Sequence, residues 1–135
     1  MIGVGSRHGL LAGAELGGGL QFPVQGAIGY QTSDHRVYAR ADAVIDTATS
    51  DADGSRPTLG ARVGAGLGWS LAASNDGARL GPVLAAGPSL GWVIDGPAAC
   101  GSARTVLELS VEVRYAGEWQ LVLAPRITRG EKFCI

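Results

Sequence analysis

Two glutamates and two arginines near the end of the chain are the strongest candidates for chemistry in this sequence. Glu108 and Glu112 flank Ser110 at alternate positions, so all three share one face of an extended strand. Paired carboxylates can act as a general acid and a general base. Arg114 and Arg126 are expected nearby, however, and carboxylates surrounded by arginines favour a structural ion-pair network over catalysis.

The other residues that could catalyse a reaction or bind a metal form no recognisable site. His8 and His35 each follow a serine by two residues, but both pairs fall in expected turns or near the terminus. Neither Cys100 nor Cys134 has a second cysteine or a histidine at ligand spacing. The Asp-rich segment 51–54 lacks the later ligands of a calcium loop. We therefore expect no enzyme activity, no cofactor and no metal site.

The segments that carry these candidates alternate between apolar and small or polar residues, with the period of two that is typical of β-strands. The clearest runs from Leu59 to Leu71. The other expected strands cover about 9–16, 20–31, 36–47, 80–94, 107–115 and 119–127. Because short turns connect most of them, the pattern predicts an all-β fold, an antiparallel up-and-down meander that closes as a barrel or stays a twisted sheet. Residues 1–135 have room for a single domain.

The two faces of these strands differ in composition. The apolar face of the five clearest segments carries no charged residue, whereas the opposite face has mixed charges and many glycines. With Glu15 added, the charged positions are Glu15, Arg40, Asp42, Asp46, Arg62, Glu108, Glu112, Arg114 and Arg126. Glycine weakens an exposed strand but relieves crowding inside a narrow barrel. We therefore expect a lumen ion-pair network with the apolar face outward, so that Gly66→Ser is mild and Ala65→Arg blocks membrane insertion.

Aromatic residues on the apolar face gather near both ends of the strands. Tyr30, Trp69, Tyr115 and Trp119 lie beside the short turns, and Trp92 lies near the opposite end. Amphipathic rings at both edges of an apolar band are typical of the aromatic girdles of transmembrane barrels. The strands are also long enough, because about 9–11 tilted residues span the hydrocarbon.

Patterns such as LGARVGAGLGWSLAA, and TVLELSVEVRY followed by WQLVLAPRI, resemble the small bacterial outer-membrane β-barrels of the OmpA/OmpX-like class. The resemblance extends over nearly the whole chain and implies a transmembrane barrel of about eight strands in a Gram-negative outer membrane. It also implies a Glu/Arg network in the lumen.

Bacterial single-chain barrels have an even number of strands, whereas the pattern yields seven. Either Met1 to Ser6 forms another strand, or the chain is part of a longer barrel, or the barrel closes by association.

Charge and hydropathy exclude other classes of protein. Lys and Arg number 11 against 12 Asp and Glu, without a basic run, so nucleic acid is not an expected partner. No stretch of about 18 apolar residues predicts a transmembrane helix. Residues 1–8 lack the pattern of a signal peptide, so an exported protein would be a mature or trimmed form.

The two cysteines test the topology independently. In a seven-strand meander, Cys100 and Cys134 fall at the same end, and a disulfide between them would imply an oxidising compartment. The other interpretation is two unrelated free thiols.

Three functional hypotheses follow. The first is an outer-membrane barrel with a structural, adhesive or narrow-pore role, whose partner is membrane lipid. The second is a soluble lipocalin-like or avidin-like barrel that binds a small apolar ligand. The third is a β-rich subunit completed by a partner edge or by a further copy of the chain.

Overall fold

The computed structural model describes residues 1–19, 24–46, 55–71, 80–95 and 103–131. The alternating segments form strands, and no helix occurs in these ranges. The eight strands are β1 (Ile2–Gly5), β2 (Gly9–Gly19), β3 (Val24–Gln31), β4 (Arg36–Asp46), β5 (Arg56–Ser70), β6 (Leu80–Asp95), β7 (Ala103–Ala116) and β8 (Trp119–Glu131). Within the described ranges, no helix is long and apolar enough to cross a membrane.

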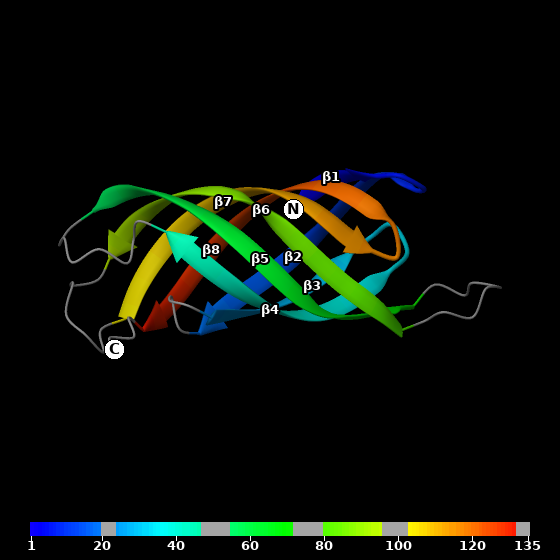
Figure 1. The fold of residues 1–135 in the computed structure, drawn as a ribbon, viewed down its shortest axis with the longest axis horizontal. Helices are drawn as coiled ribbons and strands as arrows, with labels where there is room; N and C mark the ends of the chain where they lie inside the picture. Colours follow the sequence, from blue (N-terminus) through cyan, green and yellow to red (C-terminus); the bar gives the residue numbers. More distant parts are fainter. Residues whose placement is uncertain (20–23, 47–54, 72–79, 96–102, 132–135) are drawn as a thin grey trace.

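Each strand pairs antiparallel with the next, and β1 pairs with β8 as well as with β2, so the sheet closes on itself (Figure 1). This closed barrel confirms the all-β antiparallel meander. It also resolves the strand count, because Ile2–Gly5 supplies the eighth strand. The chain therefore closes the ring without an edge from a partner.

The ring closes differently at its two ends. β1 has only four residues, and Met1, just before it, bonds through its terminal amine to the Gly13 carbonyl at 2.8 Å. Further along β2 than Gly13, β2 and β8 pair directly and in parallel, Gly17 with Thr128 and Gly18 with Arg129. We call residues 14–18 of β2 and 124–129 of β8 the β2–β8 seam.

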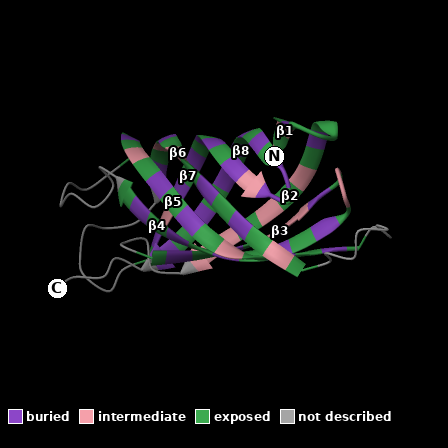
Figure 2. Ribbon diagram, turned by 45° about the vertical axis from the view of Figure 1, so that its right-hand side comes forward, coloured by how far each residue is buried: buried purple, intermediate pink, exposed green. Residues whose placement is uncertain are grey.

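The faces of the barrel are oriented as the pattern predicts. Figure 2 shows buried and exposed residues alternating along the strands. On β5, Val63 is 63% exposed and Leu67 is 59% exposed, whereas Arg62 is 2% exposed. The apolar face thus points outward and the charged face inward. Small apolar clusters, such as Leu11 with Val122 and Ala124, also lie inside.

The expectation that Gly66→Ser is mild is wrong. A Cβ at Gly66 would overlap the carbonyl oxygen of Ala39 and lie 2.6 Å from the Cα of Arg40 on the neighbouring strand. Gly66 is therefore required for close approach of β4 and β5, and it does not simply leave room in the lumen.

We expect Gly66→Ala to destabilise the fold by about 1–3 kcal/mol, as overpacking generally does. Gly81→Ala is the matched control, since the nearest atom to its Cβ would be Nη1 of Arg36 at 3.7 Å. Urea unfolding of both variants measures the difference. Equal stability of the two would contradict the close approach at Gly66.

Candidate functional site

The centre of the barrel holds a carboxylate, Glu112, that bonds three arginines from three strands. Its carboxylate oxygens lie 2.5 Å from Nη2 of Arg126, 2.7 Å from Nη2 of Arg114 and 3.3 Å from Nη1 of Arg40. The hydroxyl of Ser110 donates a hydrogen bond to Glu112 at 2.9 Å and accepts one from Arg126 at 2.6 Å. These contacts join β4, β7 and β8 across the lumen.

A second carboxylate, Glu15 on β2, bonds the same three arginines. Its oxygens lie 3.1 Å from Arg114 and 3.3 Å from Arg40, and it forms a short ion pair with Arg126. The hydroxyl of Tyr38 donates to Glu15 and accepts from Nη1 of Arg114 at 2.8 Å. Two carboxylates thus share three guanidinium groups, an arrangement in which each charge has several partners.

The network continues toward the other end of the barrel through Arg62. Its Nη1 lies 2.5 Å from Asp42, and its Nη2 lies 2.8 Å from Glu108. Asp42 also accepts a hydrogen bond from Nη2 of Arg40 at 3.0 Å, which links this group to the centre. Gln25 on β3 accepts a further hydrogen bond from Arg62 at 3.1 Å.

The network is buried, and its positive and negative charges balance. Every ionised side chain in it is at most 5% exposed. Four arginines face four carboxylates, so the described network is neutral. Charges buried in pairs stay in place because separating them leaves an uncompensated charge in a low-dielectric interior. The arrangement fills the lumen with fixed side chains.

The structure brings together eight of the nine residues expected in the lumen. Asp46 belongs to β4, but its side chain lies outside the described residues. Sequence reasoning missed Tyr38, which is 5% exposed and sits between Glu15 and Arg114. Its position was readable, since it alternates in phase with Arg40 on the charged face of the same strand.

The aromatic residues lie on the outer face, as expected. Trp69 and Trp119 are 48% and 60% exposed and lie at the strand ends next to the β3–β4 and β7–β8 turns. Tyr115 packs edge-on against Trp119, with ring centroids 5.4 Å apart, and the Tyr30 hydroxyl lies 2.7 Å from Nδ1 of His35. Trp92, 47% exposed, lies near the opposite end. Whether these rings form a membrane girdle stays a prediction.

Cys100 and Cys134 lie outside the described residues, so their pairing stays a prediction. Among the described residues, no group of three or more His, Cys, Asp or Glu could hold a metal ion.

Glu118, in the turn between β7 and β8, is a structurally important position that sequence reasoning missed. Its carboxylate accepts hydrogen bonds from the main-chain N–H groups of Arg7 and His8 at 2.5 and 3.1 Å and lies 2.9 Å from Nδ1 of His8. It therefore ties the β1–β2 turn to the β7–β8 turn and fixes β1 in the ring.

The pKa of Glu118 predicts how this tie depends on pH. Burial raises that pKa, but the hydrogen bonds from Arg7 and His8 outweigh burial and lower it below its usual value. A lowered pKa in the folded state means that the stabilisation is complete above about pH 4.3, the usual glutamate pKa, and is lost as the pH falls through the folded-state pKa. Urea unfolding should show wild type more stable than Glu118→Gln at pH 7, with the difference shrinking in acid.

His8→Ala is the control for this prediction, because it keeps both main-chain N–H donors and should retain the same trend. A stability difference between wild type and Glu118→Gln that stays constant from pH 7 to pH 3 would rule out the carboxylate tie.

Comparison with known proteins gave no match. No family model matches the chain, and no curated protein or solved structure is significantly similar to it.

Proposed function

We propose that this chain is a transmembrane β-barrel of a bacterial outer membrane, with a structural role and a closed lumen. One observation carries the proposal: large apolar side chains point outward and are exposed on all eight strands, from Ile2 (61%) on β1 to Ile127 (67%) on β8. A soluble monomer rarely exposes apolar patches larger than a few hundred Å². A band that surrounds the whole barrel matches the hydrocarbon of a bilayer.

The inner face supports the same proposal. A soluble barrel that binds an apolar ligand needs an apolar cavity, whereas buried arginines and carboxylates occupy the middle of this one. An inward charged face and an outward apolar face are the arrangement of membrane barrels, whose strands alternate apolar-out and polar-in. The hypothesis of a barrel completed by a partner has no support from the topology, because β1 and β8 close the ring.

The closed lumen distinguishes a structural barrel from a pore. Glu15 and Glu112 are joined to Arg40, Arg114 and Arg126 by contacts of 3.3 Å or less. An ion crossing the barrel would have to separate these pairs. We therefore expect no steady conductance.

Refolding from urea into detergent micelles and into lipid vesicles tests this proposal. We expect the folded protein to migrate faster on a gel before heating than after it, to require detergent or lipid for solubility, and to conduct no steady current in a planar bilayer. A monodisperse protein in detergent-free buffer would contradict the membrane location. A stable open channel would contradict the closed lumen.

A further inference from the structure

Main-chain hydrogen bonding is incomplete at the β2–β8 seam. The parallel ladder pairs Gly17 with Thr128 and Gly18 with Arg129, and it stops there. One residue further, a parallel ladder would join the Ile127 N–H to the Glu15 carbonyl. The parallel ladder does not extend to this bond, and β1 pairs only as far as Ile2 with Ala12 and Leu123, so β1 does not supply a partner for the Ile127 N–H or the Glu15 carbonyl either.

The direction of these two groups follows from the ladder below them. The carbonyl of Trp119 on β8 accepts a hydrogen bond from the Ser6 N–H, so the main-chain groups of Trp119 point toward the β1 side. Every second residue of a strand points its main-chain groups to the same side, and Ile127 therefore faces the seam. Met1 and Gly13 bond each other through N–H and carbonyl groups, so alternate residues of β2, including Glu15, face the seam likewise. A main-chain donor and an acceptor therefore face each other without bonding directly.

The solvent exposure of Glu15 agrees with main-chain groups that face the seam without a direct partner. The side chain of Glu15 is 1% exposed, yet the residue as a whole is partly exposed, so its accessible atoms belong to the main chain. Pro125, the preceding residue on this side of β8, has no N–H, and its carbonyl lies on the same side as the Glu15 N–H.

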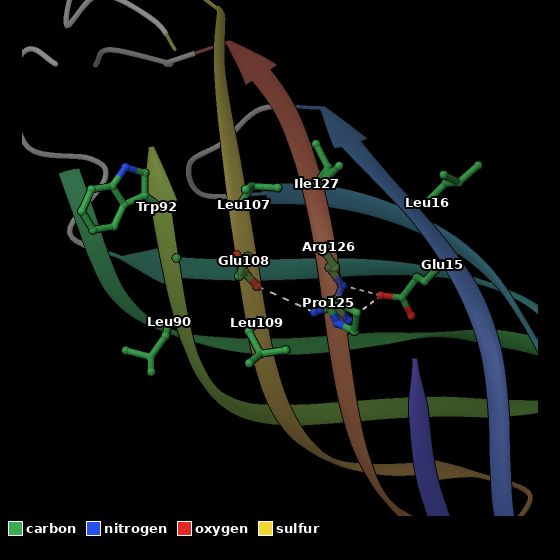
Figure 3. A pocket seen from close by; sticks show the side chains of 11 residues that line it. Glu15, Leu16, Leu90, Trp92, Leu107, Glu108, Leu109, Pro125, Arg126 and Ile127 are labelled. Atoms are coloured by element: carbon green, nitrogen blue, oxygen red, sulfur yellow. Dashed lines mark hydrogen bonds and ion pairs between the residues drawn. The ribbon is translucent and has the colours of Figure 1, made fainter. Parts of the chain in front are cut away.

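An apolar groove of about 700 Å³ on the outer face ends at the β2–β8 seam, beside Glu15 and Ile127 (Figure 3). Two rows of outward side chains form its walls, and the strand register aligns them across β6, β7 and β8. The rows are Leu90, Leu109 and Pro125, and Trp92, Leu107 and Ile127. Leu16 and Glu15 on β2 close the end of the groove at the seam.

A positive charge lies at the end of the seam. Arg129 is exposed on the outer face, two residues after Ile127, which corresponds to roughly 7 Å along the strand. The groove therefore leads from an apolar channel, past an unpaired donor and acceptor, to a cation.

Given the membrane location proposed above, we propose that this groove binds an acyl chain that carries a hydroxyl group close to an anionic head group. The chain lies between the two apolar rows. Its hydroxyl accepts a hydrogen bond from the Ile127 N–H and donates one to the Glu15 carbonyl, and the anionic group lies near Arg129. Unpaired main-chain groups in hydrocarbon are unfavourable, and a plain acyl chain leaves both unsatisfied.

Trp92, in the wall of the groove, reports occupancy directly. Of the three tryptophans in the chain, Trp69 and Trp119 are replaced by phenylalanine, which leaves Trp92 as the only tryptophan. A brominated tetradecanoic acid in micelles quenches its fluorescence when bound. We expect 3-hydroxytetradecanoic acid to displace that probe at a concentration about fivefold lower than tetradecanoic acid does, as one net hydrogen bond provides.

Two variants test the contact with the anionic group and the contact with the hydroxyl group separately. Arg129→Ala should weaken binding of both acids and leave the preference for the hydroxylated one. Ile127→Pro removes the unpaired N–H and should abolish the preference. Equal displacement by the two acids in the parent protein, or quenching that does not saturate, would overturn the proposal while the heat-dependent gel shift still reports a folded barrel. Loss of that shift in the parent protein would overturn the membrane proposal as well.

Discussion

Arginine at position 65 is expected to reduce strongly the fraction of the protein that folds into a bilayer. Ala65 lies near the middle of β5 and points outward, paired with Ala41 on β4 and Leu84 on β6, all on the apolar face. An arginine facing lipid at mid-membrane costs about 2–4 kcal/mol. That is a large part of the stability of a small domain, which is about 5–15 kcal/mol in total. The folded fraction in lipid vesicles, read from the heat-dependent gel shift, should fall accordingly.

Two variants make this test specific for a membrane. Ala65→Leu places a larger but apolar side chain at the same site and should fold as wild type does. Leu71→Arg places the same charge one residue beyond the end of β5, where the cost near an interface falls to about 0–1 kcal/mol. A soluble barrel would tolerate arginine equally at both exposed positions. Equal folding of Ala65→Arg and Leu71→Arg would therefore contradict the lipid-facing band.

The orientation of the strands could be predicted from the sequence because alternation is a local signal. Arg62 and Val63 are neighbours on β5, and their exposures of 2% and 63% follow from opposite phases of one pattern. The lumen network could be predicted for the same reason, since Arg40 and Glu112 share the inward phase on different strands.

What depends on neighbouring strands could not be predicted. The strand Ile2–Gly5 is too short to show a period, and only its pairing with both β2 and β8 identifies it. Gly66 was interpreted as a residue that leaves space, because the sequence does not reveal the Ala39 carbonyl across the ladder. Glu118 lies in a turn, and its partners are more than 100 residues away in the chain.

Removing Arg114 is expected to cause a large loss of stability. Its guanidinium bonds Glu112 at 2.7 Å, Glu15 at 3.1 Å and the Tyr38 hydroxyl at 2.8 Å, and its side chain is 0% exposed. Arg114→Ala leaves two buried carboxylates with one cation fewer. Breaking a buried ion pair by removing one partner costs about 3–5 kcal/mol. Urea unfolding in micelles measures the change, and Arg7→Ala, which removes the same charge from an exposed turn residue, should have little effect.

A compensating substitution shows whether this loss comes from the uncompensated charge. In the double variant Arg114→Met with Glu112→Gln, one positive and one negative charge are removed together, so the lumen is neutral again. Because replacing a buried ion pair costs far less than stranding one partner, we expect the double variant to regain part of the stability lost in Arg114→Met alone. If the stability lost in the double variant equals the sum of the losses in Arg114→Met alone and Glu112→Gln alone, Arg114 and Glu112 do not interact in the folded barrel.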